Sequence, residues 1–595
     1  MNQAVSDFYI RKKEQFTHEL KTISQTLNRF VWYRVISFVL IFVPVSVWGV
    51  STWLTLWFTL AAIILFFYLV KKNIQHEKRK KKTATLLKIT RNELLALEHS
   101  FAHFENGASF LNTDHFYTYD LDIFGEGSLF QYINRTSTKS GRQVLANRLI
   151  FPLLDKNKIE KRQEAVKELS EMPEWRLQFL ANGLLFEETE EMNHEIKNWS
   201  ETELDLKNSI ATKWLITIVP LLTILALIPA FTGSSDFWIS AAVFAQWSFM
   251  FFYRKRIRQY FRYFGRKSDL LEKYMQLLQF IEEKKFQSEY LQEIQKTVTT
   301  PDSASHIFRQ LKKRVKEFEY RGNIIVGIFL NSVFLWDIRC VYKLWKWHSK
   351  NHKKLALWLD AVAETDALIS LANFAGNHPG FVFPKIHDGG FTFSAKQLGH
   401  PLLHSKKRVC NNLEINGWAK ALIVTGANMA GKSTFLRTVG VNLILGRMGA
   451  PVCAAEMKFT PVKLYTNMRT TDSLLKDESY FFAELKRIKG VLDRLKNGER
   501  IFVILDEMLK GTNSTDKLNG SKELIRKLIE FKSVSLIATH DLKLSEMEKE
   551  FPQQVFNKCF EIRIENNDMV FDYLLSDGVT QTMNATFLMK KMGII

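Results

Sequence analysis

Two long apolar stretches interrupt a chain that is otherwise rich in charged residues. Residues 35–70 contain no charged side chain, and a proline and a glycine lie near the middle of this run. One helix of that length would exceed a hydrocarbon core of ~30 Å, so the pattern predicts two short helices of about 17 residues joined by a tight turn. Residues 214–231 and 237–253 repeat the design on either side of the turn-like sequence at 232–236. We therefore expect two helical hairpins of membrane-spanning length.

Basic side chains follow both apolar hairpins. They are Lys71, Lys72, Lys78, Arg79, Lys80, Lys81 and Lys82 after the first, and Arg254, Lys255, Arg256, Arg258 and Arg262 after the second. Such clusters stay on the cytoplasmic side of a membrane. With an even number of spans, we expect a multi-pass protein of the plasma (inner) membrane whose soluble domains lie in the cytoplasm. The alternative is that both hairpins are buried core helices.

Most of the remaining first two thirds of the chain has helical periodicity. Residues 6–29, 82–104, 158–180 and 268–320 combine apolar positions at helical spacing with many Lys and Glu residues. Their charge runs are also what a solvated helix face carries. A third apolar run, residues 322–336, is too short to span a membrane, and we expect it to form a buried helix.

Composition narrows the class of protein. Of 595 residues, 46% are hydrophobic and 24% charged, which excludes a disordered chain. The four cysteines form no C-x-x-C pair, so neither a zinc ribbon nor a disulfide framework is expected. Lys and Arg exceed Asp and Glu by 82 − 62 = 20. This surplus favours nucleic acid or acidic lipid as a partner, although the flanks of membrane spans explain part of it.

The pattern changes near residue 376, where glycine and proline become frequent. Beyond that point, short apolar runs at residues 421–425, 501–505 and 534–538 alternate with helical patterns. Runs of this kind are typical of strands that are buried on both faces of a parallel sheet. The last third of the chain is therefore predicted to be an α/β domain.

A phosphate-binding loop follows the first of these strands. The sequence GANMAGKST after residue 425 fits the pattern G-x-x-x-x-G-K-[ST], in which backbone N–H groups and a helix N-terminus surround a phosphate. Lys432 would reach the β- and γ-phosphates of a nucleotide, and Ser433 would hold Mg²⁺. A chance match in a glycine-bearing turn is the alternative, but the flanking strand and helix are the context that the motif requires. The candidate ATP-binding residues are Gly426, Ala427, Asn428, Met429, Ala430, Gly431, Lys432, Ser433 and Thr434.

The other two strands end in residues suited to nucleotide hydrolysis. Asp506 is placed to bind Mg²⁺ together with Ser433, and Glu507 can act as the base that polarises the attacking water. A carboxylate pair that caps a helix is the alternative. His540 ends the third strand and can sense the γ-phosphate or orient the water, although a lone histidine there is also compatible with a structural role.

These residues resemble a known family. The sequence TGANMAGKSTFLR at 425–437 is similar to the phosphate loop of the MutS family of DNA mismatch-repair ATPases, which typically reads TGPNMGGKST. Residues 477–484 resemble the family signature S-T-F-x-x-E, which implies that Ser479 contacts the nucleotide of the partner subunit in a dimer. Residues 538–541 resemble the A-T-H switch, and residues 571–578 the strand whose aromatic ring covers adenine, a role that falls to Tyr573.

The resemblance extends upstream, with departures. Residues 136–153 resemble the start of the family's helical core, and residues 361–375 its returning lever helix. No mismatch-reading domain is visible in the sequence. The second apolar hairpin lies where a DNA-gripping clamp would be inserted. The resemblance therefore implies ATP and Mg²⁺ as cofactors and a homodimer formed through the ATPase domains, while mismatch reading does not carry over.

The fold class expected from the sequence is α+β and multidomain: a helical core and lever region with two transmembrane helical hairpins, followed by a P-loop α/β ATPase domain of the ABC/MutS type. The expected units are an N-terminal helical segment (1–30), a transmembrane hairpin (31–70), a basic helical linker (71–118), the first part of the core (119–213), the second hairpin (214–253), the helical lever (254–376) and the ATPase domain (377–595).

The function expected from these features is that of a membrane-anchored, MutS-like ATPase. It would bind and hydrolyse ATP at a composite dimer site and couple this to binding of mismatched, damaged or branched DNA. The alternative is a membrane-complex ATPase motor or switch that does not bind DNA. An ABC transporter is the obvious comparison for that alternative, but no LSGGQ-like element precedes Asp506.

Overall fold

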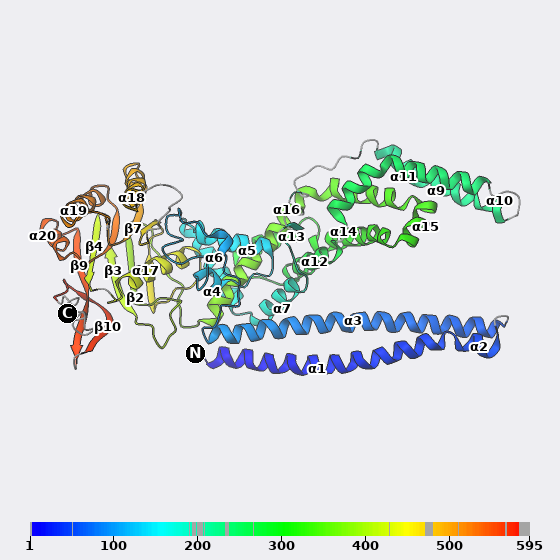
Figure 1. The fold of residues 1–595 in the computed structure, drawn as a ribbon, viewed down its shortest axis with the longest axis horizontal. Coiled ribbons are helices and arrows are strands. Elements are labelled where there is room, and N and C mark those ends of the chain that lie inside the picture. Colours follow the sequence, from blue (N-terminus) through cyan, green and yellow to red (C-terminus); the bar gives the residue numbers. More distant parts are fainter. Residues whose placement is uncertain are drawn as a thin grey trace.

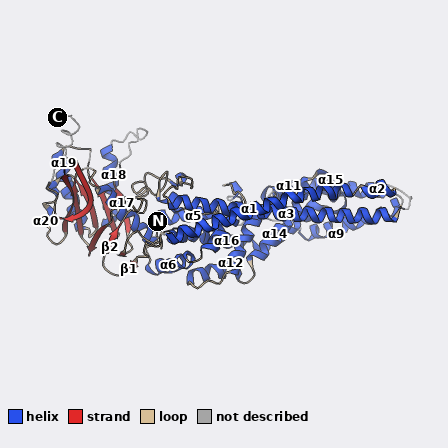
Figure 2. Ribbon diagram, turned by 90° about the horizontal axis from the view of Figure 1, so that it is seen from below, coloured by secondary structure: helices blue, strands red, loops and turns tan. Residues whose placement is uncertain are grey.

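The molecule is elongated, with its strands gathered at one end and helices forming the rest (Figures 1 and 2). The computed structural model describes residues 3–49, 52–189, 191–192, 195, 198, 206, 209–231, 237–265, 267–427, 429–469, 480–509, 511–565 and 568–581. A mixed α+β, helix-rich architecture of several domains was predicted from the sequence, and the structure confirms it.

A long helical hairpin opens the chain. It consists of α1 (Gln3–Leu40), the short α2 (Val43–Trp48) and α3 (Trp53–Leu97). We expected short helices here, but α1 and α3 continue unbroken from the apolar run into the charged segments beside it. The halves near the core bury apolar residues such as Tyr9, Phe16 and Leu86. The far halves expose almost all of their apolar side chains.

Polar contacts fix the inner end of this hairpin to the helical core. Glu93 of α3 forms an ion pair with Arg135 at 2.5 Å, and both side chains are almost fully buried. Asn377 donates to the other Glu93 oxygen at 2.9 Å and accepts from the Tyr9 hydroxyl at 3.0 Å. Because a buried charge without its partner costs several kcal/mol, these contacts hold the hairpin at one place on the core.

The core is a cluster of helices around one very long helix. Its members are α4 (Leu129–Ile133), α5 (Lys139–Ile150), α6 (Lys156–Ser170), α7 (Pro173–Leu184) and α16 (Trp336–Asn377), with a 3₁₀ turn at Ala108–Phe110. Asp366 of α16 is fully buried and accepts hydrogen bonds of 2.7–3.0 Å from the backbone and hydroxyl groups of Ser137 and Thr138. It therefore attaches the start of α5 to α16, which contains the returning helix expected at residues 361–375.

A second helical arm extends from the core in the same direction as the first hairpin (Figure 1). It contains α9 (Ser209–Leu225), α10 (Leu227–Phe231), α11 (Phe237–Phe264), α12 (Ser268–Glu283), α13 (Glu289–Thr299), α14 (Ala304–Glu319) and α15 (Ile324–Phe334), with a 3₁₀ turn at Tyr320–Gly322. The expected turn at 232–236 lies outside the described residues. Helices α12 to α14 bury one face each, as their amphipathic sequences require.

One expectation for this arm was wrong. Residues 322–336 were expected to form a buried helix, but α15 exposes most of its apolar side chains, and only Gly327 and Asn331 are buried. The sequence did not reveal this because a short apolar run has the same pattern in a protein core and on an apolar surface.

Three helical stretches of the described chain are long and apolar enough to cross a membrane, judged by length and composition alone. They are Gln3–Trp48, Trp53–Leu97 and Ser209–Pro229. A fourth results if Ile324–Phe334 and Trp336–Asn377, which are bent by 81° at their junction, count as one span. Helix α11, the expected second member of the second hairpin, is not among them.

The last third of the chain forms two sheets with helices packed against them. A four-stranded sheet has the order β1-β5-β2-β3, and a six-stranded sheet has the order β10-β9-β4-β8-β7-β6. In the larger sheet β9, β4, β8, β7 and β6 are parallel, as predicted, and β10 is antiparallel at one edge. The strands are β1 (Lys385–Ile386), β2 (Thr392–Leu398), β3 (Asn411–Asn416), β4 (Lys420–Gly426), β5 (Glu456–Phe459), β6 (Lys463–Asn467), β7 (Ile501–Asp506), β8 (Val534–Thr539), β9 (Val555–Glu565) and β10 (Asp568–Asp577).

The core and the sheet domain share one apolar interior. Buried side chains from α5, α6 and α16 continue through α17 (Lys432–Arg447) to one face of the six-stranded sheet. A separate cluster under α18 (Tyr480–Lys496) and α19 (Ser514–Glu530) covers the other face, and α20 (Met547–Glu550) lies beside β9 after a 3₁₀ turn at Leu542–Leu544. A displacement of α17 would therefore change the packing of the helical core, because packed interiors transmit strain.

The segment before α4 adds polar connections between the two regions. Asp120 is fully buried and accepts hydrogen bonds from the Thr466 hydroxyl at 2.6 Å and the Arg469 backbone at 3.0 Å. Asp122 binds the guanidinium groups of Arg469, at 2.5 Å, and of Arg437 on α17, at 3.0 Å. This segment, which leads back to α3, therefore contacts both the helix after the phosphate loop and the end of β6.

Candidate functional site

The predicted phosphate loop lies between β4 and α17, and two of its glycines are required by the geometry. Gly426 has φ +149°, and a Cβ there would lie 2.9 Å from the Phe560 carbonyl oxygen. Gly431 has φ +102°, and a Cβ there would lie 3.0 Å from the Tyr573 ring. Gly431 also precedes α17 without a side-chain cap, so the first N–H groups of this helix remain available to an anion.

Lys432 extends into the loop that precedes it. Its ammonium group donates to the carbonyl oxygens of Gly426, at 2.7 Å, and Ala427, at 2.9 Å. Burial lowers the pKa of the Lys432 ammonium to about 8, and the nearby carboxylates of Asp506 and Glu507 oppose this effect. The two ring nitrogens of His540 lie 3.3 and 3.4 Å from the same ammonium. A buried cation held by neutral carbonyls and an imidazole ring is suited to receive a negatively charged phosphate.

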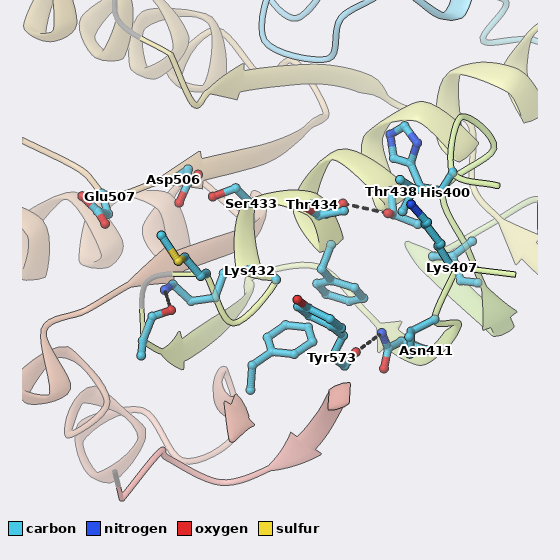
Figure 3. A pocket seen from close by; sticks show the side chains of 18 of the residues that line it. His400, Lys407, Asn411, Lys432, Ser433, Thr434, Thr438, Asp506, Glu507 and Tyr573 are labelled. Atoms are coloured by element: carbon cyan, nitrogen blue, oxygen red, sulfur yellow. Dashed lines mark hydrogen bonds between the residues drawn. The ribbon is translucent and has the colours of Figure 1, made fainter. Parts of the chain in front are cut away.

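A cavity of about 730 Å³ opens in front of the loop. Its volume falls in the range of ~300–1,000 Å³ that is usual for small-molecule sites. Ten of the predicted site residues line the cavity. Six come from the loop and the start of α17, namely Ala427, Met429, Gly431, Lys432, Ser433 and Thr434, and the other four are Asp506, Glu507, His540 and Tyr573. Figure 3 shows the Ser433 hydroxyl and the Asp506 carboxylate facing the same part of this cavity, as two ligands of one Mg²⁺ would.

Glu507 and His540 meet at the ends of two neighbouring strands. The His540 ring nitrogen Nε2 lies 2.7 Å from Glu507 Oε1, and both side chains are partly exposed to the cavity. The Glu507 backbone has φ +54°, and its N–H donates to the Ala538 carbonyl of β8 at 3.0 Å. Strain of this kind in a non-glycine residue persists where the surroundings fix it, which is common at functional sites.

Glu484 supports the loop that carries Glu507. It is almost fully buried, and its Oε1 accepts from the Leu509 backbone at 2.7 Å and from the Asn467 side chain at 3.4 Å. From the sequence, Glu484 was expected only to end the segment that resembles the S-T-F-x-x-E signature, whose Ser479 is predicted to contact the partner subunit's nucleotide. Its contact with a loop 25 positions away gives it a positioning role within its own chain.

Tyr573 lies across the cavity from Asp506, and its neighbours hold it there (Figure 3). The pairing of β9 with β10 shifts register between Phe571 and Leu575, and Tyr573 at this irregularity has φ +54°. Asn411 fixes the bulge because its side chain donates to the Tyr573 carbonyl at 3.0 Å and accepts from the Leu575 N–H at 2.7 Å. The Phe571 ring stacks on the Tyr573 ring with centroids 6.0 Å apart.

Four further polar residues line the cavity and were not among the predicted site residues: His400, Lys407, Asn411 and Thr438. Lys407 is an exposed cation at its rim. Burial, together with the Arg437 and Arg408 guanidinium groups, lowers the pKa of His400 to about 4. His400 is therefore neutral at pH 7 and presents a neutral hydrogen-bonding edge. Residues 399–401 (GHP) and 411–412 (NN), which resemble the segment through which the MutS family approaches the nucleotide, were the signals in the sequence for this wall of the site.

Several predicted residues do not line the cavity or cannot be placed. Gly426 lies behind it, where its carbonyl oxygen binds the Lys432 ammonium. Ala430 belongs to the loop, and its side chain is buried. Asn428 and Ser479 lie outside the described residues, so the expected contribution of Ser479 to a partner's site stays a prediction.

Comparisons with known proteins identify both regions. Residues 111–372 match the family model of MutS domain III, and residues 422–590 match that of MutS domain V. MutS protein homolog 4 of Homo sapiens is 28% identical over 46% of this chain and 28% of its own length. DNA mismatch repair protein MutS of Thermotoga petrophila is 30% identical over 41% of this chain and 31% of its own. DNA mismatch repair protein MSH3 of Candida albicans is 28% identical over 49% of this chain and 29% of its own.

These matches define a protein with the helical core and the C-terminal domain of a mismatch-repair family. The chain belongs to the MutS family. It matches less than a third of the length of each of these relatives.

Proposed function

We propose that this protein is a membrane-anchored ATPase of MutS type that couples ATP binding and hydrolysis to DNA binding. The observation that carries the ATPase part is the convergence of Lys432, Ser433, Asp506, Glu507 and His540 on one cavity beside a helix N-terminus. Lys432 and Ser433 begin α17, and the other three residues lie at the ends of the parallel strands β7 and β8. Each of the five has a chemical role in phosphoryl transfer to water.

Each of the site's side chains has its own role in ATP binding or hydrolysis. Lys432 exchanges its carbonyl partners for the β- and γ-phosphate oxygens, while the N–H groups at the start of α17 receive the same phosphates. Ser433 and Asp506 would hold Mg²⁺, which neutralises phosphate charge when bound. Glu507 accepts the proton of the attacking water, and His540, 2.7 Å away, keeps the carboxylate oriented. Tyr573 offers its ring to the adenine base.

The pH dependence of binding provides a test of the role of Lys432. Below pH 8 the lysine is already charged, so ATP affinity should be flat. Above pH 8 the free protein holds a neutral lysine, and binding of phosphate must take up a proton. We therefore expect ATP affinity to fall by up to about tenfold per pH unit there. Isothermal titration in buffers of different ionisation enthalpy measures both the affinity and the proton.

The matched control for this titration is Lys432→Arg, whose guanidinium stays charged in the same pH range. Its ATP affinity should not decline between pH 8 and the onset of general unfolding. An equal decline in both proteins, or no decline in either, would contradict the assignment of the titrating group to Lys432.

The DNA part of the proposal is supported by the relatives, two of which are named as DNA mismatch repair proteins. The net charge of +20 is consistent with a polyanionic partner. Nucleotide binding would move α17, whose Arg437 contacts Asp122, and the shared apolar interior would carry that movement to α16 and the arms. The family pattern supports a homodimer in which the partner subunit's Ser479 completes each site.

A motor or switch that acts within the membrane and does not bind DNA is the second candidate function. It is favoured by the far ends of both arms, which expose Leu, Ile, Phe and Trp side chains that do not match DNA phosphates. ATP hydrolysis by the detergent-solubilised protein separates the two candidates when it is measured with matched duplex, mismatched duplex, a four-way junction and single-stranded DNA. A rate changed by one of these DNAs supports the first candidate, and a rate indifferent to all of them supports the second.

Membrane anchoring has its own test. The Phe30 and His76 rings lie 5.1 Å apart, and the Thr212 and Tyr253 hydroxyls 2.8 Å apart, so residues 31–72 and 213–252 can each be replaced by a short turn. Because exposed apolar surface favours lipid by ~25 cal/mol per Å², the intact chain should remain in the membrane fraction at high salt. The double deletion should move to the soluble fraction. Retention of the deleted chain in the membrane fraction would contradict anchoring by these hairpins.

A further inference from the structure

Helix α15 has an apolar surface that nothing in the described chain covers. Its sequence, IIVGIFLNSVF, has no charged residue. Ile324 and Ile325 are 76% and 81% exposed, and Phe329 is 61% exposed. A contiguous exposed apolar face of this kind marks contact with an apolar partner. The helix packs on α9 and α11, whose outward side chains, such as Leu221 and Phe244, are also apolar and exposed.

The chain bends by 81° where α15 ends, and a buried glutamine satisfies the broken backbone. Leu335 has φ +48°, so the backbone groups around it leave the helical pattern. Gln246 of α11 is fully buried; its side chain accepts from the Leu335 N–H at 3.1 Å and donates to the Val333 carbonyl at 3.0 Å. It also donates to the Thr223 hydroxyl of α9 at 2.6 Å.

The two ends of the α15 excursion are held together. Arg321, before α15, forms an ion pair with Asp337, after it, at 3.5 Å. Trp336 donates to the Glu317 carbonyl at 2.9 Å, and Lys343 binds the Glu317 carboxylate at 2.9 Å. An α-helix rises 1.5 Å per residue, so the 11 residues of α15 extend roughly half of a ~30 Å hydrocarbon core. The segment is therefore too short to cross such a core, and the chain enters and leaves it on the same side.

We propose that α15 is a re-entrant segment that inserts into the same bilayer as α9 and α11, with lipid acyl chains covering Ile324, Ile325 and Phe329. In hydrocarbon, irregular backbone is tolerated only where protein satisfies its N–H and C=O groups, which is what Gln246 does at the bend. Acyl chains are the occupant because the exposed face is continuous with the exposed faces of α9 and α11. This inference rests on the membrane anchoring proposed above.

The depth of a single fluorophore tests the inference in the full-length chain. Ile325→Cys on α15, Leu221→Cys on α9 and Lys313→Cys on the exposed face of α14 are made in a Cys410→Ser background, because the other three cysteines are buried. Each is labelled with NBD and reconstituted into vesicles of phosphatidylethanolamine and phosphatidylglycerol. The labels at 325 and 221 should be quenched by doxyl-labelled lipid and shielded from iodide, and the label at 313 should show the reverse.

The result at position 221 separates failure of the inference from failure of the anchoring. A label at 325 that behaves like the one at 313, while the label at 221 stays in lipid, overturns the inference and leaves the anchor intact. Labels at both 325 and 221 in water overturn the placement of the second hairpin in the membrane, and the inference with it.

A second pair of variants tests the glutamine. Gln246→Leu removes both hydrogen bonds to the bend, and we expect the label at 325 to become accessible to iodide while the label at 221 remains shielded. Trp247→Phe is the control, since it removes one bond between the same two helices, to the Ser332 hydroxyl, and leaves the bend satisfied. Equal shielding of position 325 in both variants would contradict the role of Gln246.

Discussion

Replacing Glu507 with glutamine is expected to leave ATP binding intact and to slow ATP hydrolysis by about 10²–10⁴-fold, which is the usual contribution of a general base. The amide has the size of the carboxylate but cannot take a proton from water. Its oxygen can still accept a hydrogen bond from His540, whose Nε2 lies 2.7 Å from Glu507 Oε1 in the unchanged protein. The wall of the cavity should therefore keep its shape. Nucleotide affinity and steady-state phosphate release, measured on the same preparation, separate binding from turnover.

Glu546→Gln is the matched control, because Glu546 is exposed on the same domain and does not line the cavity. Its turnover should equal that of the unchanged protein. Ordinary turnover in Glu507→Gln would reject Glu507 as the base. Loss of ATP binding in that variant would mean that the carboxylate is needed to assemble the site.

Replacing Lys432 with alanine is expected to weaken ATP binding by about a hundredfold or more. Hydrogen bonds from a charged donor contribute ~1.5–3 kcal/mol each, and the ammonium is placed to make two of them with phosphate. The variant also loses the contacts of Lys432 with the Gly426 and Ala427 carbonyls, which hold the loop in its present form. Titration with a fluorescent ATP analogue measures the loss, and thermal unfolding checks that the domain remains folded.

Two nearby lysines provide controls for the loss of ATP affinity in Lys432→Ala. Lys406→Ala removes an equal charge from an exposed position outside the cavity and should leave the affinity unchanged. Lys407→Ala removes a cation from the rim of the cavity and should cause a smaller loss than Lys432→Ala. An unchanged affinity in Lys432→Ala would reject the phosphate-loop assignment.

The loop between β4 and α17 and the strands beside it could be predicted because their signals are local. Gly426 and Gly431 are spaced for a loop whose backbone has positive φ, and three apolar runs match β4, β7 and β8 within one residue at each end. The carboxyl ends of parallel strands meet at one edge of a sheet, so the strand pattern alone was enough to expect Asp506, Glu507 and His540 near one another.

The supporting contacts could not be predicted, since they join distant parts of the chain. Asn411 fixes Tyr573 across 162 positions, and Asp120 binds Thr466 across 346. Nothing in the sequence around an aspartate or an asparagine specifies such a partner. The lengths of α1 and α3 were also missed, because the apolar and charged parts of each helix have different patterns although the backbone is continuous.

The most direct test of ATP hydrolysis at this site is Mg²⁺-dependent phosphate release from ATP by the purified full-length protein, compared with Glu507→Gln purified in the same way. We predict steady release by the unchanged protein, a rate that depends on Mg²⁺, and release close to background in the variant. Equal rates in the two proteins, or no release above background in either, would contradict the claim that this cavity hydrolyses ATP.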